Sequence, residues 1–129
     1  MTTRVILSRA ILLCRGSSGV ASSVNFFQNG LGLTVLRHTD DWAELACCAS
    51  DRNNRFRLNL KSVQSEAQLS SGYNQILQFE VEDLDGAVAR CAQLGASMDG
   101  PVQYPAHGKV SVMRTDQGHM IGIYEANVM

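Results

Sequence analysis

Hydrophobic and polar residues alternate along two stretches of this chain, one in each half. In residues 56–61 the apolar set is Phe56, Leu58 and Leu60, and the polar set is Arg57, Asn59 and Lys61. In residues 75–81 one face carries Leu77, Phe79 and Val81, and the other carries Ile76, Gln78 and Glu80. A period of two predicts β-strands that bury one face and leave the other polar.

Two further segments repeat apolar residues at helical spacing, which predicts helices over 19–27 and 84–94. The apolar stripes consist of Val20, Val24 and Phe27 in the first helix, and of Leu84, Val88 and Cys91 in the second. We expect Ser17 or Ser18 to cap the first helix and Asp83 to cap the second. These side chains accept hydrogen bonds from the free N–H groups at a helix N-terminus.

The same order of elements occurs twice, over residues of about 4–62 and 73–125. Each half reads as a strand, a short helix and about three further strands. Two copies are too few for a solenoid, which needs about three stacked units. We therefore expect one α+β domain over residues 1–129. Its two βαβββ modules would form a curved mixed sheet cup with helices on the convex face, and the cavity between them would be the place for a ligand.

The composition of the chain excludes several classes of partner. With 129 residues, of which 45% are hydrophobic, the chain has the size and composition of one globular domain. No apolar run approaches the ~20 residues that cross a bilayer. The net charge of −1 gives no long-range attraction to nucleic acid or to an anionic membrane.

Cysteine usage and charge bear on compartment and assembly. The four cysteines are Cys14, Cys47, Cys48 and Cys91, and they show no CxxC spacing, so reduced and mostly buried thiols are expected. Arg4, Arg9 and Arg15 lie among serines, and the first acidic residue is Asp40, as in mitochondrial transit segments. That region reads better as a strand, so we expect a cytoplasmic protein. Only 18% of the residues are charged, which favours a surface covered by a second subunit, as in a homodimer.

Three short motifs follow one another along the chain. They are Phe26-Phe-Gln-Asn-Gly-Leu-Gly-Leu33, then Phe79-Glu-Val-Glu-Asp-Leu-Asp85 running on to Leu94-Gly95-Ala96, and finally Asp116-Gln-Gly-His-Met-Ile-Gly-Ile-Tyr124. Together they resemble the vicinal oxygen chelate superfamily, which contains glyoxalase I, bleomycin-resistance proteins, fosfomycin-resistance enzymes and extradiol dioxygenases. The resemblance implies the fold over almost the whole chain. It does not fix a function, because this fold hosts many chemistries.

The resemblance also implies where a metal would lie. Catalytic members hold a divalent metal on four strand positions with His, Gln or Glu. The matching positions here are Ala10, Asn59, Ile76 and Gly122. Three of these side chains have no donor atom and an amide alone is a poor ligand, so we expect neither a metal nor another cofactor.

The resemblance indicates that the polar strand faces line the cup rather than simply face solvent. The candidate ligand-binding residues are Arg57, Asn59, Gln78, Glu80, Tyr124, Trp42 and Tyr104. By alternation the same concave face would also hold Leu12, Cys14 and Met120. The guanidinium of Arg57 favours a small organic ligand that is anionic or carbonyl-bearing.

Three functions remain open at this point. The first is a metal-free, non-catalytic ligand-binding protein. The second is a lyase, isomerase or epimerase that uses Glu80, His107 or His119 as its acid or base. The third is an interaction module with a vestigial cavity. His38, beside two aspartates, reads as a surface residue.

Overall fold

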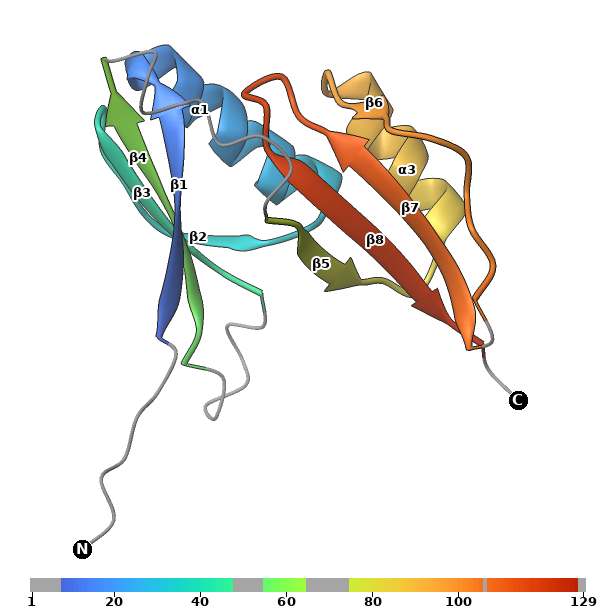
Figure 1. The fold of residues 1–129 in the computed structure, drawn as a ribbon. Helices are drawn as coiled ribbons and strands as arrows, with labels where there is room; N and C mark the ends of the chain where they lie inside the picture. Colours follow the sequence, from blue (N-terminus) through green and yellow to red (C-terminus); the bar gives the residue numbers. More distant parts are fainter. Residues whose placement is uncertain (1–7, 48–54, 65–74, 106, 128–129) are drawn as a thin grey trace, which may run out of the picture.

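A computed structural model describes residues 8–47, 55–64, 75–105 and 107–127 of the chain. Its elements fall into two successive modules (Figure 1). The N-terminal module contains β1 (Arg9–Arg15), α1 (Gly16–Asn25), the π-helical turn η1 (Phe26–Gly30), β2 (Thr34–His38), β3 (Trp42–Ala46) and β4 (Arg57–Val63). The C-terminal module contains β5 (Leu77–Glu80), α3 (Leu84–Gln93), β6 (Ser97–Met98), β7 (Gly108–Arg114) and β8 (Met120–Ala126).

The two modules build two four-stranded sheets with the same topology. Sheet A has the order β1-β4-β3-β2, and sheet B has the order β5-β8-β7-β6. In each sheet the first strand pairs in parallel with the last strand of its module, and the other pairings are antiparallel. The predicted α+β fold of two βαβββ modules is confirmed.

A single apolar core joins the two modules. Leu58 and Leu60 of sheet A and Ile121 and Ile123 of sheet B are all buried in it. Helix α1 packs on β1, β3 and β4, and α3 packs on β7 and β8. The turn η1 packs on α3, and the ring of Phe27 lies 5.9 Å from that of Phe79 on β5. The helices therefore cover one face of each sheet and leave the other face open.

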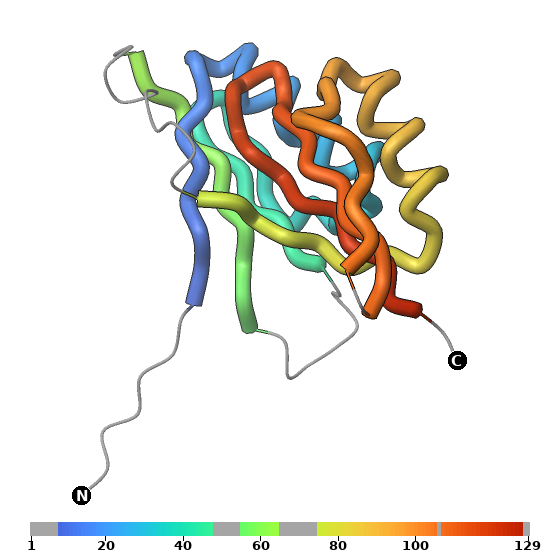
Figure 2. The backbone as a smooth tube through the Cα atoms, turned by 45° about the vertical axis from the view of Figure 1, so that its right-hand side comes forward, coloured from blue at the N-terminus to red at the C-terminus, as the bar shows by residue number. Residues whose placement is uncertain are grey.

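A second junction lies where the turn between β7 and β8 meets the start of α1 (Figure 2). The side-chain oxygen of Gln117 accepts from the backbone N–H of Arg15 at 2.9 Å. The hydroxyl of Ser22 donates to Asp116 at 2.6 Å. Polar bonds at this end thus supplement the apolar contact made by Phe27.

The two helices begin differently. The carboxylate of Asp83 accepts from the N–H of Gly86 at 3.2 Å, so the predicted cap of α3 is confirmed. The predicted serine cap of α1 is wrong, because Arg15 is the residue before that helix and makes no side-chain cap bond. The chain turns at Gly16, whose φ of 65° suits glycine, and this places Ser17 and Ser18 inside the first turn.

No helix among the described residues is long and apolar enough to cross a membrane.

Candidate functional site

The face of sheet A that points away from α1 is predominantly polar, and we call it the open face of sheet A. The register of the strands places side chains from all four strands on it. They are Arg9, Ile11 and Leu13 of β1, Arg57, Asn59 and Lys61 of β4, Trp42 and Glu44 of β3, and Arg37 of β2. The predicted alternation of β4 is therefore confirmed.

Strand β1 corrects the sequence prediction by one residue. Ala10, Leu12 and Cys14 were expected on the concave face, but they pack into the core. The parallel register places Ala10 beside the buried Leu58 and Ile11 beside Asn59. The apolar run Ile11-Leu12-Leu13 has no alternation that distinguishes its two faces, so only the pairing with β4 fixes its orientation.

The open face of sheet B carries the candidates from the second module. Gln78 lies beside Gly122, and Glu80 lies beside Tyr124. A Cβ built on Gly122 would be 3.4 Å from a methyl carbon of Ile76, so Ile76, Gln78 and Gly122 form one neighbourhood. Met120, two residues before Gly122 on the same strand, is buried.

The aromatic candidates are divided between the two sheets. Trp42 lies on sheet A, where it pairs with Lys61. On the second module, Tyr104 is 77% exposed, and the hydroxyl of Tyr124 donates to the backbone carbonyl of His107 at 3.1 Å. That bond places Tyr124 at the rim of sheet B.

An open hollow of about 520 Å³ lies at one end of sheet A. Its lining consists of Asp41, Trp42, Lys61, Ser62, Val63 and Gln64. The hydroxyl of Ser62 donates to the carboxylate of Asp41 at 3.0 Å, which fixes part of this lining. The hollow brings together an indole, an ammonium group and a carboxylate.

His119 serves the junction between the modules. Its Nε2 lies 2.8 Å from the carbonyl oxygen of Leu13 on β1. Burial lowers the pKa of His119 below its ordinary value of 6.5, and the bond to Leu13 and the charge of Asp116 oppose that shift. With the ring neutral, its Nε2–H donates to Leu13, and the buried Nδ1 has no hydrogen-bond partner among the described residues.

The other titratable candidates are placed less centrally. His107 and His38 are exposed, and the surface position predicted for His38 is confirmed. Cys14 is buried with its sulfur 3.4 Å from the hydroxyl of Ser23, and burial raises the pKa of its thiol. Burial likewise raises the pKa of Cys91 to about 11, so neither thiol is prepared to act as a nucleophile.

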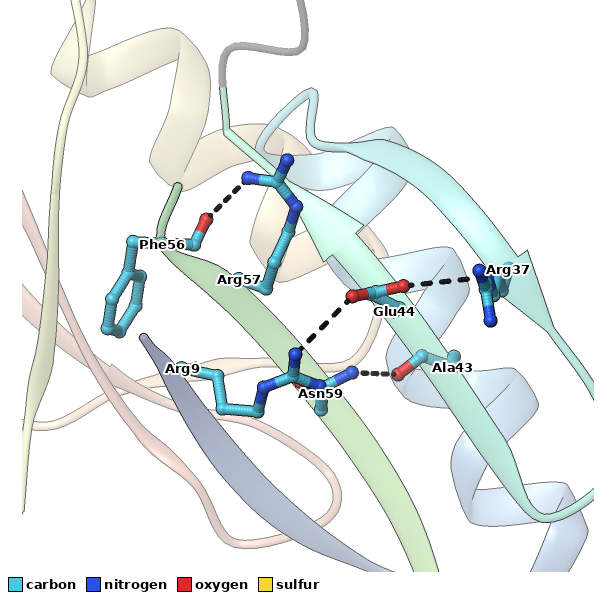
Figure 3. A network of polar contacts seen from close by, with 7 residues as sticks. All are labelled: Arg9, Arg37, Ala43, Glu44, Phe56, Arg57 and Asn59. Atoms are coloured by element: carbon cyan, nitrogen blue, oxygen red, sulfur yellow. Dashed lines mark hydrogen bonds and ion pairs between the residues drawn. The ribbon is translucent and has the colours of Figure 1, made fainter. Parts of the chain in front are cut away.

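A polar cluster at the centre of sheet A contains residues that the sequence analysis missed (Figure 3). Arg9 donates to the side-chain oxygen of Asn59 at 3.0 Å, and its second terminal nitrogen lies 4.0 Å from Glu44. The other carboxylate oxygen of Glu44 lies 3.8 Å from Nε of Arg37. Arg57, on the same face, donates to the carbonyl of Phe56 at 3.0 Å.

The positions that match the metal ligands of the superfamily do not fit a divalent metal. Asn59 is fully buried; its amide oxygen accepts from Arg9, and its amide nitrogen donates to the carbonyl of Ala43 at 3.3 Å. Ile76 and Gly122 have no donor atom. The described residues contain no group of three or more His, Cys, Asp or Glu that suits a metal. A cationic guanidinium on the one amide would also repel a metal ion.

This chain is an α+β protein built from two βαβββ modules of the same topology, each with a polar open face. The sequence matches the Glyoxalase/Bleomycin resistance protein/Dioxygenase superfamily over residues 14–123, and the chain belongs to that superfamily. No curated protein matches the sequence.

Solved structures with low sequence identity share the fold. A glyoxalase family protein from Bacillus cereus is 17% identical with a TM-score of 0.75, and the match covers 99% of each chain. A glyoxalase/bleomycin resistance protein/dioxygenase family enzyme from Burkholderia phytofirmans is 16% identical with a TM-score of 0.74, over 95% of this chain and 100% of that one. The bleomycin-binding protein of Streptomyces verticillus, solved with copper(II)-bleomycin, is 18% identical with a TM-score of 0.62, over 98% of this chain and 100% of that one.

Proposed function

We propose that this protein binds a small anionic or carbonyl-bearing organic molecule on its open sheet faces, without a metal and without catalysis. The observation that carries the proposal is the cluster in which Glu44 and the buried Asn59 are engaged by arginine side chains on the open face of sheet A. Guanidinium groups offer planar donors for carboxylate and carbonyl oxygens. The bleomycin-binding protein of Streptomyces verticillus gives a precedent for ligand binding on this fold.

An enzymatic function has weaker support. His119 is engaged with the backbone of β1, and His107 is an exposed residue whose carbonyl accepts from Tyr124. Glu80 is the remaining candidate for an acid or base. It lies on the open face of sheet B, where it pairs in register with Tyr124. A lyase, isomerase or epimerase would therefore depend on Glu80, and loss of turnover in Glu80→Gln would identify it.

We also propose that the protein is a homodimer. Among the described strands, β1 pairs with β4 alone and β5 with β8 alone, so each sheet has one open edge on that side. Ile11 on β1 and Ile76, just before β5, are each 50% exposed. A second copy that covers these edges would remove apolar surface and unpaired backbone groups from water. Light scattering should give twice the 14.1 kDa of one chain, and a monomer at micromolar concentration would contradict the proposal.

A thermal-shift screen of metabolites and drugs, followed by calorimetry on the hits, tests the ligand proposal. Arg57→Ala should weaken the binding of a hit by roughly 1.5–3 kcal/mol, because a hydrogen bond to a charged group is lost. Tyr124→Ala should also weaken binding, because it removes a flat contact from sheet B. His38→Ala is the control, since His38 is an exposed residue of β2 outside the candidate set. Unchanged binding in both site variants would exclude the open faces and favour an interaction module.

A further inference from the structure

The carboxylate of Glu44 is shared by two arginine side chains on the open face of sheet A. Its two oxygens lie 4.0 Å from Arg9 and 3.8 Å from Arg37 (Figure 3). The Glu44 side chain is 17% exposed, whereas those of Arg9 and Arg37 are 42% and 79% exposed. The acidic group therefore lies deeper in the cluster, and the two cationic groups lie nearer to solvent.

The charges of this cluster do not cancel. Two guanidinium groups face one carboxylate, so Arg9, Arg37 and Glu44 carry a net positive charge. A guanidinium has five N–H donors. Arg9 uses one of them in its 3.0 Å bond to Asn59. Donors thus remain on a group whose position is already restrained, and a restrained donor loses less entropy when a ligand binds.

Arg9 links two neighbouring strands of sheet A. Its guanidinium donates to the amide oxygen of Asn59 at 3.0 Å. Asn59 is fully buried, and the bond from Arg9 ties β1 to β4 above it. A restrained guanidinium therefore lies on the open face where β1 meets β4.

We infer that Arg9 and Arg37, positioned by Glu44 and Asn59, form a binding site for the oxyanion of a small molecule, a carboxylate or a phosphate. This inference rests on the proposed function and specifies the chemical group that is recognised. The guanidinium of Arg9 supplies a positive charge and directed hydrogen-bond donors. Arginine suits this role because its planar fork matches two oxygens of a carboxylate or phosphate.

The test is a titration of the ¹⁵N-labelled protein with benzoate and, separately, with inorganic phosphate at constant ionic strength. Both anions should shift backbone N–H signals of β1, β3 and β4. Arg9→Gln should raise the apparent Kd roughly tenfold or more, because a charged hydrogen bond is lost. Arg37→Gln should raise it less, because that side chain is 79% exposed. Arg114→Gln is the matched control, since it removes one positive charge from the exposed end of β7 in sheet B.

Wild-type Kd values in Arg9→Gln, shifts confined to sheet B, or no binding of either anion to the wild type would overturn the inference. Arg9→Lys keeps the charge but loses the fork, so it should bind with an intermediate Kd, and it serves in place of Arg9→Gln if that variant does not fold. A screening hit that binds independently of Arg9 would refute this site and leave the proposed function standing. If the anions bind through Arg9 but no organic compound displaces phosphate, this site is supported and the proposed function is contradicted.

Discussion

The open faces of the two sheets differ in charge although the modules share one topology. Among the described residues, sheet A presents Arg9, Arg37, Arg57 and Lys61 together with the carboxylate of Glu44. Sheet B presents Ile76, Gln78, Glu80, Gly122 and Tyr124. Over the whole modules, residues 4–62 contain eight Lys or Arg and four Asp or Glu, whereas residues 73–125 contain three and seven.

This difference shows that the residues on the core side and on the open side of the same strands are constrained by different requirements. The core side needs only apolar volume, so Leu58 and Leu60 in one module correspond to Ile121 and Ile123 in the other. The open side is free to take a different chemistry in each module. The overall net charge of −1 conceals two halves of opposite sign.

The largest predicted effect concerns the core that both modules share. Phe27 is fully buried and its ring contacts that of Phe79, so Phe27→Ala should lower the free energy of unfolding by about 3–5 kcal/mol. Urea denaturation, followed by Trp42 fluorescence in sheet A and by amide signals in sheet B, should give one common transition. Leu36→Ala, at a side chain that is 42% exposed, should stay within about 0.5 kcal/mol. A loss of sheet A alone would contradict the shared core.

The helix starts provide a second contrast between the modules. Asp83→Ala removes the cap of α3 and should cost about 1 kcal/mol. Ser17→Ala should cost less than about 0.5 kcal/mol, because α1 has no side-chain cap bond and Ser17 is exposed. Chemical denaturation of the two variants measures the contrast. Equal losses would mean that a serine does cap α1.

The smallest predicted effect concerns pH and the junction at His119. Burial lowers the pKa of folded His119 below 6.5, while in the unfolded chain it takes a proton as the pH falls below about 6.5. The unfolded state then binds more protons, so stability is full above that pH and is lost as the pH falls. His119→Gln should flatten this loss between pH 7.5 and 5, whereas His107→Gln, at an exposed position, should not. Parallel pH profiles for the wild type and His119→Gln would contradict the role assigned to His119.

The sequence was sufficient to predict the C-terminal module closely. Its strand β5 alternates clearly, and Asp83 stands directly before an apolar helical stripe. The N-terminal module was harder because Ile11-Leu12-Leu13 is apolar on both sides, and its facing depends on a partner strand about fifty residues away. The start of α1 was misplaced because Gly16 begins the turn before the serines.

The polar cluster of Arg9, Arg37 and Glu44 could not be predicted from the sequence, because it also depends on how separate strands pair. Arg9, Arg37 and Glu44 come from three strands, and none of them lies in a recognisable motif. Arg37 also follows a register shift between β2 and β3, so counting residues from Val35 would place it on the wrong face. The predictable part, Arg57 and Asn59 on one face of β4, came from strict alternation within a single strand.

The most direct test of the account is calorimetric titration of a screening hit into protein dialysed against EDTA, repeated after one equivalent of zinc is added. We expect the same Kd in both conditions, and a Kd roughly tenfold or more higher in Arg57→Ala. We also expect far less than one equivalent of divalent metal per chain by elemental analysis before dialysis. Binding that appears only with zinc, or a metal content near one equivalent, would contradict the claim that arginine side chains rather than a metal hold the ligand.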